Sequence, residues 1–215
     1  KFKRPAVVRN RRNEAQQDCK TIKNNDAGAL SGHYWVTLRT NSTYVVECDM
    51  STDGGGWTKL YGNYSSEASS SAWALSWDTV VNLGKNFGTT PAEGNFLLPM
   101  KFWKWFPLAR FTSARSGSIL LNGFSVEGGD YKLNFNATGN GGMDYHRGRR
   151  LSTVDRDNDS WGNSCPQYGQ TFGWYGACCN LCMTTGQGGW PGGSNRYWPS
   201  DWNYKQTDWL EFWAR

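Results

Sequence analysis

The residue types best suited to chemistry lie in one acidic segment, S-T-V-D-R-D-N-D-S-W-G-N-S-C, at residues 152–165. Asp155, Asp157 and Asp159 alternate along it, and three carboxylates so close together repel one another unless a cation lies among them. Hard oxygen ligands from carboxylates and turn carbonyls suit Ca²⁺. The segment is not an EF-hand loop, because Gly162 falls at position eight instead of six and Pro166 stands where the last Glu belongs. A solvated acidic turn is the alternative, and these residues alone favour neither.

Cysteine is the second residue type that could carry chemistry, and four of the six cysteines form a C-x12-C-C-x2-C cluster. Four thiolates could bind zinc, but Cys165 has no near partner with which to form a ligand pair. An even count also suits disulfides in an oxidising compartment. Three Asn-x-Ser/Thr glycosylation sequons, at Asn41, Asn63 and Asn136, support that second interpretation. The sequence therefore favours a secreted, disulfide-bonded glycoprotein.

Catalytic patterns are poorly represented. The histidines are His33, in a strand-like segment, and His146, in a loop rich in Gly and Arg, and neither lies near a plausible nucleophile. The sequence has no G-x-S-x-G, no phosphate-binding loop and no H-E-x-x-H. We therefore predict that the protein is not an enzyme.

Composition indicates a globular domain rich in loops and aromatic residues. The chain has 215 residues with 13 Trp, 10 Tyr and 26 Gly, and a net charge of only +5, which argues against a disordered chain. No apolar run is long enough for a transmembrane helix. The positive charge is concentrated in K-F-K-R-P-A-V-V-R-N-R-R at 1–12, a basic tail that could contact a polyanion or serve as a solvated linker.

Several segments have the patterns of regular elements. Residues 34–38 and 44–50 read as β-strands joined by the polar turn R-T-N-S, and the three glycines at 54–56 should break the chain before a strand resumes at 57–61. Apolar spacing predicts a helix over 73–83, ended by Gly84. Residues 118–124, 129–136 and 208–214 read as further strands. Regular periodicity is absent from 139–204.

The aromatic segment P-M-K-F-W-K-W-F-P-L-A-R, at 99–110, has two interpretations. Phe102, Trp103 and Phe106 are expected in the core. A short helix lying on a membrane surface is the alternative.

The run L-S-T-V-D-R-D-N-D-S-W-G-N-S-C closely resembles the calcium loop of fibrinogen-related domains, the family of ficolins, tachylectins, angiopoietins, tenascins and fibrinogen chains. The segments S-G-H-Y-W-V and V-E-C-D-M-S-T-D-G-G-G-W-T, D-Y-K-L-N-F and the terminal W-N-Y-K-Q-T-D-W-L-E-F-W-A-R resemble the same family. The resemblance covers almost all of 18–215 and is weakest over 62–115.

The resemblance implies an α+β fold, a fibrinogen C-terminal-like globe preceded by a basic tail or linker at 1–17. The expected parts are a disulfide-closed N-terminal subdomain (18–57), a central, mainly antiparallel sheet flanked by short helices (58–143), and a loop-rich calcium and ligand subdomain with a returning C-terminal strand (144–215). It also implies the disulfides Cys19–Cys48 and Cys165–Cys178.

By position, the resemblance implies that Asp157 and Asp159 bind Ca²⁺ through their side chains and that Trp161 and Asn163 bind it through their carbonyls. Asp155 would be a neighbour of the ion. In lectin members a ligand pocket for acetyl groups adjoins this loop and uses a cis peptide, here Ala177–Cys178. The other expected pocket residues are Tyr175, Cys179, Trp190, Tyr197, Trp198 and Tyr204.

The sequence departs from the lectin pattern at Cys179, where many members have His. Cys179 and Cys182 are expected to form an added bridge, with vicinal or shuffled pairing as the alternative. The resemblance implies a secreted, calcium-dependent lectin or pattern-recognition domain for glycans or acetylated groups, assembled as a homo-oligomer in the full-length protein. The alternative is a matrix or receptor-ligand domain that binds protein, with structural calcium.

Overall fold

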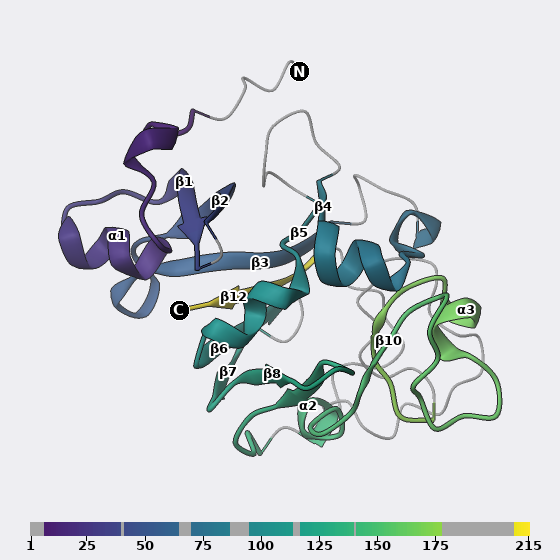
Figure 1. Cartoon of the computed structure of the whole chain (residues 1–215). Coiled ribbons are helices and arrows are strands. Elements are labelled where there is room, and N and C mark those ends of the chain that lie inside the picture. The colour runs from purple at the N-terminus through teal and green to yellow at the C-terminus, as the bar shows by residue number, and fades with distance from the viewer. Residues whose placement is uncertain are drawn as a thin grey trace.

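One antiparallel sheet forms the centre of the fold, seen in a computed structural model that describes residues 7–39, 41–64, 70–86, 95–113, 117–139, 141–177 and 209–215. Its main path has the order β1-β2-β3-β12-β6-β7, and β5 and β4 extend from β3. The C-terminal strand β12 therefore lies between β3 and β6, in the middle of the sheet (Figure 1). The strands are β1 (Gly32–Leu38), β2 (Ser42–Asp49), β3 (Trp57–Tyr64), β4 (Lys85–Asn86), β5 (Phe96–Leu97), β6 (Leu108–Ser113), β7 (Gly117–Asn122) and β12 (Trp209–Ala214).

The N-terminal elements follow the sequence-based prediction closely. Strands β1 and β2 form the expected hairpin, and the disulfide Cys19–Cys48 joins β2 to the short helix α1 (Cys19–Asn25). Asp18 caps this helix by accepting a hydrogen bond from Thr21 N–H, which satisfies one of the free donors at its start. The Cys19–Cys48 pairing is thus confirmed.

The glycine run after β2 allows a close approach of two backbones. The 3₁₀-helix η2 (Thr52–Gly54) leads to Gly55, which has φ +74° and lies so close to Met50 O that no Cβ could fit. The chain then enters β3 at Trp57, as the sequence predicted, and the strand continues to Tyr64.

The helix predicted over 73–83 is only partly present. The 3₁₀-helix η3 (Ser70–Trp73) ends at Trp73, and the π-helix η4 (Thr79–Leu83) follows after an irregular stretch. Ser76 Oγ accepts a hydrogen bond from Thr79 N–H, so this residue starts a new helical segment and interrupts the predicted one. Gly84, with φ +70°, ends η4 as predicted.

The aromatic segment 99–110 is split between a helix and a strand. The 3₁₀-helix η5 (Met100–Trp105) is followed by β6. Phe102, Trp103 and Phe106 are all buried, which confirms them as core residues, and the Trp103 ring lies 5.7 Å from that of Phe212. The segment therefore packs inward and forms no amphipathic surface helix.

The face of the sheet that is turned away from Phe212 and the aromatic core is covered by long side chains of the sheet itself. The pairing of β12 with β3 shifts register between Phe212 and Trp213. As a result Tyr61 packs into the core, whereas Lys59 lies on the opposite face of the sheet, where it is covered by neighbouring side chains. Cationic groups lie over aromatic rings across this outer face, at 4.3–5.6 Å from the ring centroids. The alternating cations and rings are Arg215, Trp57, Arg110, Trp213, Lys59 and Tyr64.

The remaining elements are short; those after residue 139 agree with the lack of periodicity predicted there, and β9 occupies only part of the strand predicted at 129–136. The hairpin β8 (Ser125–Glu127) and β9 (Lys132–Asn134) lies below the sheet in Figure 1, and the pair β10 (Leu151–Ser152) and β11 (Gly173–Trp174) lies toward the other end from α1. The helices there are α2 (Gly141–Asp144) and α3 (Cys165–Gly169).

Candidate functional site

The acidic segment forms a loop between β10 and α3. Asn158 fixes it from within, because its N–H donates to Ser152 Oγ at 2.9 Å and its Nδ2 donates to Leu151 O at 2.7 Å. At the other end Ser164 Oγ caps α3 by accepting from Gln167 N–H. With Asn158 bound to the start of the loop, the flanking residues Asp157 and Asp159 are brought together.

Asp157 and Asp159 lie together in the loop. Asp157 Oδ1 accepts from Asp159 N–H at 3.1 Å, and the two oxygens of Asp159 accept from Trp161 N–H and Cys165 N–H, each at 2.8 Å. Burial raises the pKa of Asp159, the two N–H donors lower it, and the neighbouring Asp157 raises it, so that it lies above its ordinary value. The loop thus concentrates negative charge that a cation would neutralise.

Asp155, the first acidic residue of the series, is directed elsewhere. Its Oδ1 accepts from Trp77 N–H and from Thr153 Oγ1, both at 2.7 Å. Burial alone would raise the pKa of Asp155, but these hydrogen bonds hold it below its ordinary value. Asp155 therefore connects the loop to the start of the helical segment at Trp77.

The donor set of the loop fits a calcium ion. Two carboxylates lie together, and the expected carbonyl ligands of Trp161 and Asn163 belong to the same loop. Across the described residues, no group of three or more His, Cys, Asp or Glu side chains could hold a metal ion. A cation here would therefore depend on two carboxylates together with neutral oxygens.

A backbone hydrogen bond connects the acidic loop to the segment that leads into the expected ligand pocket. Ser160 N–H donates to Gly176 O at 3.0 Å. Tyr145 Oη lies against Gly176 so closely that no Cβ could be added, and it accepts from Ala177 N–H at 3.3 Å. This role of Tyr145 has no local sequence signal, because its partners are more than 30 residues away along the chain.

The predicted pocket residues are only partly described. Tyr175 is 1% exposed, and burial together with the negative charge of Asp159 raises its pKa against the opposing effect of a hydrogen bond with Thr171. Ala177 is exposed. Other predicted residues, and the expected cis peptide Ala177–Cys178, lie outside the described residues: Cys178, Cys179, Trp190, Tyr197, Trp198 and Tyr204.

The cysteine and glycan predictions have different outcomes. Cys165 is disulfide-bonded, whereas its expected partner Cys178 and the expected pair Cys179–Cys182 lie outside the described residues. Asn41 and Asn136 are exposed and remain predicted glycan sites. Asn63 is 1% exposed within β3, which argues against a glycan on the folded chain at that position.

His146 is a buried histidine beside the same segment. Its Nδ1 donates to Trp174 O at 2.7 Å, while its Nε2 is buried without a hydrogen-bond partner among the described residues. Burial lowers the pKa of His146 to about 4, and Arg149 lowers it further against the opposing effect of the Trp174 carbonyl. This residue is therefore a neutral structural histidine at physiological pH.

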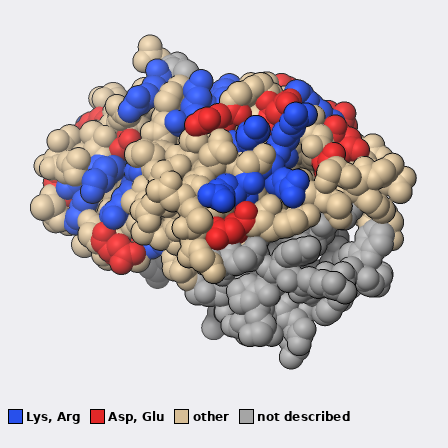
Figure 2. Space-filling model, turned by 90° about the horizontal axis from the view of Figure 1, so that it is seen from below, with Lys and Arg blue, Asp and Glu red and all other residues tan. Residues whose placement is uncertain are grey.

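The basic tail is described only from Val7 onward. Within it, Arg9 Nε donates to Ser31 O and Arg12 lies over the Trp35 ring at 5.5 Å. On the face of the molecule shown in Figure 2, basic and acidic side chains are interspersed, so this face presents no continuous basic surface among its described residues. Polyanion binding through the tail remains a prediction.

Comparison with known proteins identifies the class of protein that this fold and loop define. The family model for the C-terminal globular domain of fibrinogen beta and gamma chains matches residues 15–89 and 116–207. The chain therefore belongs to the fibrinogen C-terminal domain family, whose globes are non-catalytic binding modules.

Two relatives show the range of proteins that contain this domain. Human tenascin-R is 30% identical over 181 residues, covering 75% of this chain and 12% of the relative. Fibrinogen-like protein A of Apostichopus parvimensis is 25% identical over 201 residues, covering 86% of this chain and 70% of the relative. The chain thus spans only a small part of the tenascin relatives. Tenascins and fibrinogen are secreted extracellular proteins.

Solved structures confirm the fold. The fibrinogen-like globe domain of human ANGPTL6 matches with a TM-score of 0.73 at 19% identity, covering 100% of this chain and 98% of that one. A lamprey fibrin D-dimer in complex with the peptide Gly-His-Arg-Pro-amide matches with a TM-score of 0.67 at 17% identity, covering 94% of this chain and 74% of that one. The predicted α+β globe with its antiparallel sheet is therefore correct.

None of the helices in the described part of the chain has both the length and the apolar character needed to cross a bilayer.

Proposed function

We propose that this chain is a secreted, calcium-dependent binding domain whose ligand is a glycan or an acetylated group. The observation that carries the proposal is the pairing of Asp157 and Asp159, whose carboxylates lie together with a raised pKa at Asp159. A divalent cation bound between them would remove this repulsion and stabilise the loop.

The same loop supports a ligand site beside the cation. Ser160 is hydrogen-bonded to Gly176, and Ala177 follows at the entrance to the predicted pocket. A cation that orders the loop would thereby order the backbone on which the pocket residues depend. Calcium would act in binding by positioning this segment, while the ligand would contact aromatic side chains.

Calcium is expected to raise the melting temperature of the protein by about 5 °C or more at saturating concentration, because it binds the folded state alone. The double variant Asp157→Asn/Asp159→Asn should lose this shift, since it removes both charges while retaining the shape of the side chains. Differential scanning calorimetry with calcium and with EDTA measures both effects.

Asp155→Asn is the matched control for this experiment. Because Asp155 binds Trp77 and Thr153, its replacement should lower the melting temperature with and without calcium but preserve the calcium shift. An unchanged shift in the double variant would refute the calcium site.

A glycan array tests the ligand class. Binding to glycans or acetylated compounds that EDTA abolishes is the expected result, with oligomers of the full-length protein increasing avidity. Absence of any glycan signal in calcium, together with tight capture of one protein partner, would contradict the lectin proposal.

A protein ligand is the second candidate, with calcium in a structural role. It is favoured by the fibrin D-dimer, whose structure contains a bound peptide, and by Cys179, which stands where many lectin members have His. Polyanion binding by the tail is a separate possibility that deletion of residues 1–12 would test.

A further inference from the structure

A cavity of about 410 Å³ lies in the N-terminal part of the molecule, beneath an arch of the chain. The segment before α1 runs along the edge of β1, bridging Val8 to His33 and Gln16 to Val36. Between these two contacts the segment forms an arch that contains the 3₁₀-helix η1 (Arg12–Glu14). The arch leaves a space between itself, α1 and β1.

Specific hydrogen bonds hold the arch in place. Asn10 imitates a neighbouring strand, because its Oδ1 accepts from Trp35 N–H at 2.7 Å and its Nδ2 donates to Trp35 O at 3.0 Å. At the far end Gln16 O accepts from Thr37 N–H, and Gln16 Oε1 accepts from Asn25 Nδ2 at 2.7 Å. The cavity is therefore a built feature of the fold, and its volume is typical of ligand pockets.

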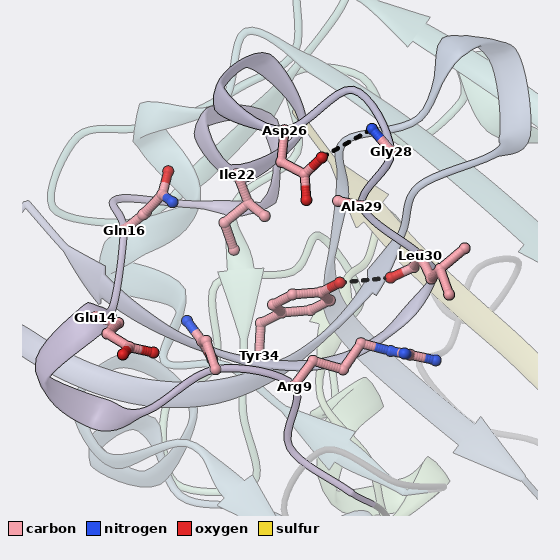
Figure 3. Close-up of a pocket in the computed structure, with 10 residues that line it drawn as sticks. Arg9, Glu14, Gln16, Ile22, Asp26, Gly28, Ala29, Leu30 and Tyr34 are labelled. Atoms are coloured by element: carbon pink, nitrogen blue, oxygen red, sulfur yellow. Dashed lines mark hydrogen bonds between the residues drawn. The ribbon is translucent and has the colours of Figure 1, made fainter.

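The cavity combines an apolar floor with an acidic rim. Ile22, Ala29 and Tyr34 are buried beneath it, and Tyr34 Oη is occupied by a hydrogen bond to Leu30 O. Figure 3 shows the carboxyl groups of Asp26 and Glu14 on two sides of this floor. Such an arrangement fits an alkyl stem that ends in a positive charge.

Among the described lining residues, the cation is Arg9. Arg9 donates through Nε to Ser31 O, and its guanidinium extends past Tyr34 toward Leu30 (Figure 3). Asp26 and Glu14 keep hydrogen bonds to the backbone N–H groups of Gly28 and Arg11, and neither forms an ion pair among the described residues. The inner rim therefore retains negative charge.

We propose that this cavity is a docking pocket for a lysine or arginine side chain of a protein partner. A polypeptide is indicated because its lysine and arginine side chains combine an alkyl stem with a terminal positive charge that complements Asp26 and Glu14, and its surface would cover Leu30, which lines the cavity and is 64% exposed. The pocket lies beside α1 and β1, toward the opposite end of the molecule from α3 and the acidic loop (Figure 1). It is thus independent of the calcium site.

The chain provides an internal probe for this site, because its isoleucines are Ile22 and Ile119 alone. Ile22 lies in the cavity floor, whereas Ile119 lies on β7, at the other edge of the sheet. With ¹³C-labelled isoleucine methyl groups, NMR titration with acetyl-Gly-Lys-Gly-amide, or with its arginine analogue, should shift the Ile22 signal saturably and leave Ile119 in place. The norleucine analogue, which lacks the charge, should leave both signals in place.

Matched variants identify the charges responsible. Asp26→Asn and Glu14→Gln can each retain their backbone hydrogen bonds, and each should weaken binding of the lysine peptide about fivefold, as for loss of one partly exposed charge pair. Asp53→Asn, an exposed carboxylate outside the cavity, should not weaken it. The unshifted Ile119 signal reports that each variant is folded.

Three results would overturn the proposal: no Ile22 shift at about 20 mM lysine or arginine peptide, an equal shift with norleucine peptide, or undiminished affinity in Asp26→Asn/Glu14→Gln. EDTA should leave the Ile22 response unchanged, so failure of the calcium site and failure of this pocket are separately visible.

Discussion

Replacing Lys59 by methionine is expected to lower the free energy of unfolding by about 3 kcal/mol, because it leaves two partly buried carboxylates without their cation. Lys59 Nζ lies 2.7 Å from Glu47 Oε2 and 3.0 Å from Glu211 Oε1, and the lysine side chain is 1% exposed. It also donates to Tyr64 Oη at 3.2 Å, and that hydroxyl in turn donates to Glu211. One cation thus connects β2, β3 and β12.

The charge state of Lys59 makes this effect measurable at neutral pH. Burial alone would lower the pKa of Lys59, but Glu211 and Glu47 raise it above its ordinary value of 10.5. A group whose pKa is raised on folding contributes its full stability below its unfolded pKa and loses it only as the pH rises through the folded pKa. The contribution is therefore complete at pH 7 and declines only in strongly alkaline solution.

Urea unfolding at pH 7 measures the prediction, and two further variants interpret it. Lys104→Met, which changes an exposed lysine on η5, should stay within about 0.5 kcal/mol of the parent. The triple variant Lys59→Met/Glu47→Gln/Glu211→Gln should recover much of the loss, because no unpaired charge remains buried. A single Lys59→Met variant as stable as the parent would show that the carboxylates find other partners.

Local patterns predicted much of the sheet. The strands predicted at 34–38 and 44–50 coincide with most of β1 and β2, and the glycines before Trp57 marked the turn correctly. These features depend on contacts within a few residues or on backbone conformations that only glycine adopts readily. The family resemblance supplied the Cys19–Cys48 pairing.

Long-range features could not be predicted in the same way. The position of β12 between β3 and β6 depends on pairing across most of the chain. The burial of Lys59 depends on the register shift opposite Trp213, which periodicity does not reveal. The helix predicted over 73–83 failed because Ser76 and Asp155 offered its backbone other hydrogen-bond partners.

In the candidate site, too, some features could be anticipated from the sequence and others depend on the folded structure. The alternation of Asp155, Asp157 and Asp159 left a cation site and a solvated acidic turn equally open, and the family resemblance singled out Asp157 and Asp159 as the side-chain ligands. The inward role of Asn158 and the contact of Tyr145 with Gly176 depend on how the loop folds back on β10 and α2. The neighbouring polar residues Asp157, Asn158 and Asp159 therefore have different roles, which are distinguished only by their contacts in the folded structure.

Acidification is expected to destabilise the protein through His146. Its pKa is lowered to about 4 in the folded state, against an ordinary value of 6.5, because burial disfavours the charged ring. Between these values the unfolded chain binds a proton that the folded chain does not, so stability falls as the pH falls through this window. The expected loss is about 2 kcal/mol at pH 5 and approaches about 3 kcal/mol near pH 4.

Because carboxylates also titrate in this range, the test compares variants. His146→Asn can keep a donor to Trp174 O but cannot gain the charge, so its free energy of unfolding should depend less on pH between 7 and 4.5 than that of the parent. Parallel pH profiles for the parent and His146→Asn, measured by urea unfolding, would show that the buried ring takes up a proton as readily in the folded chain as in the unfolded one.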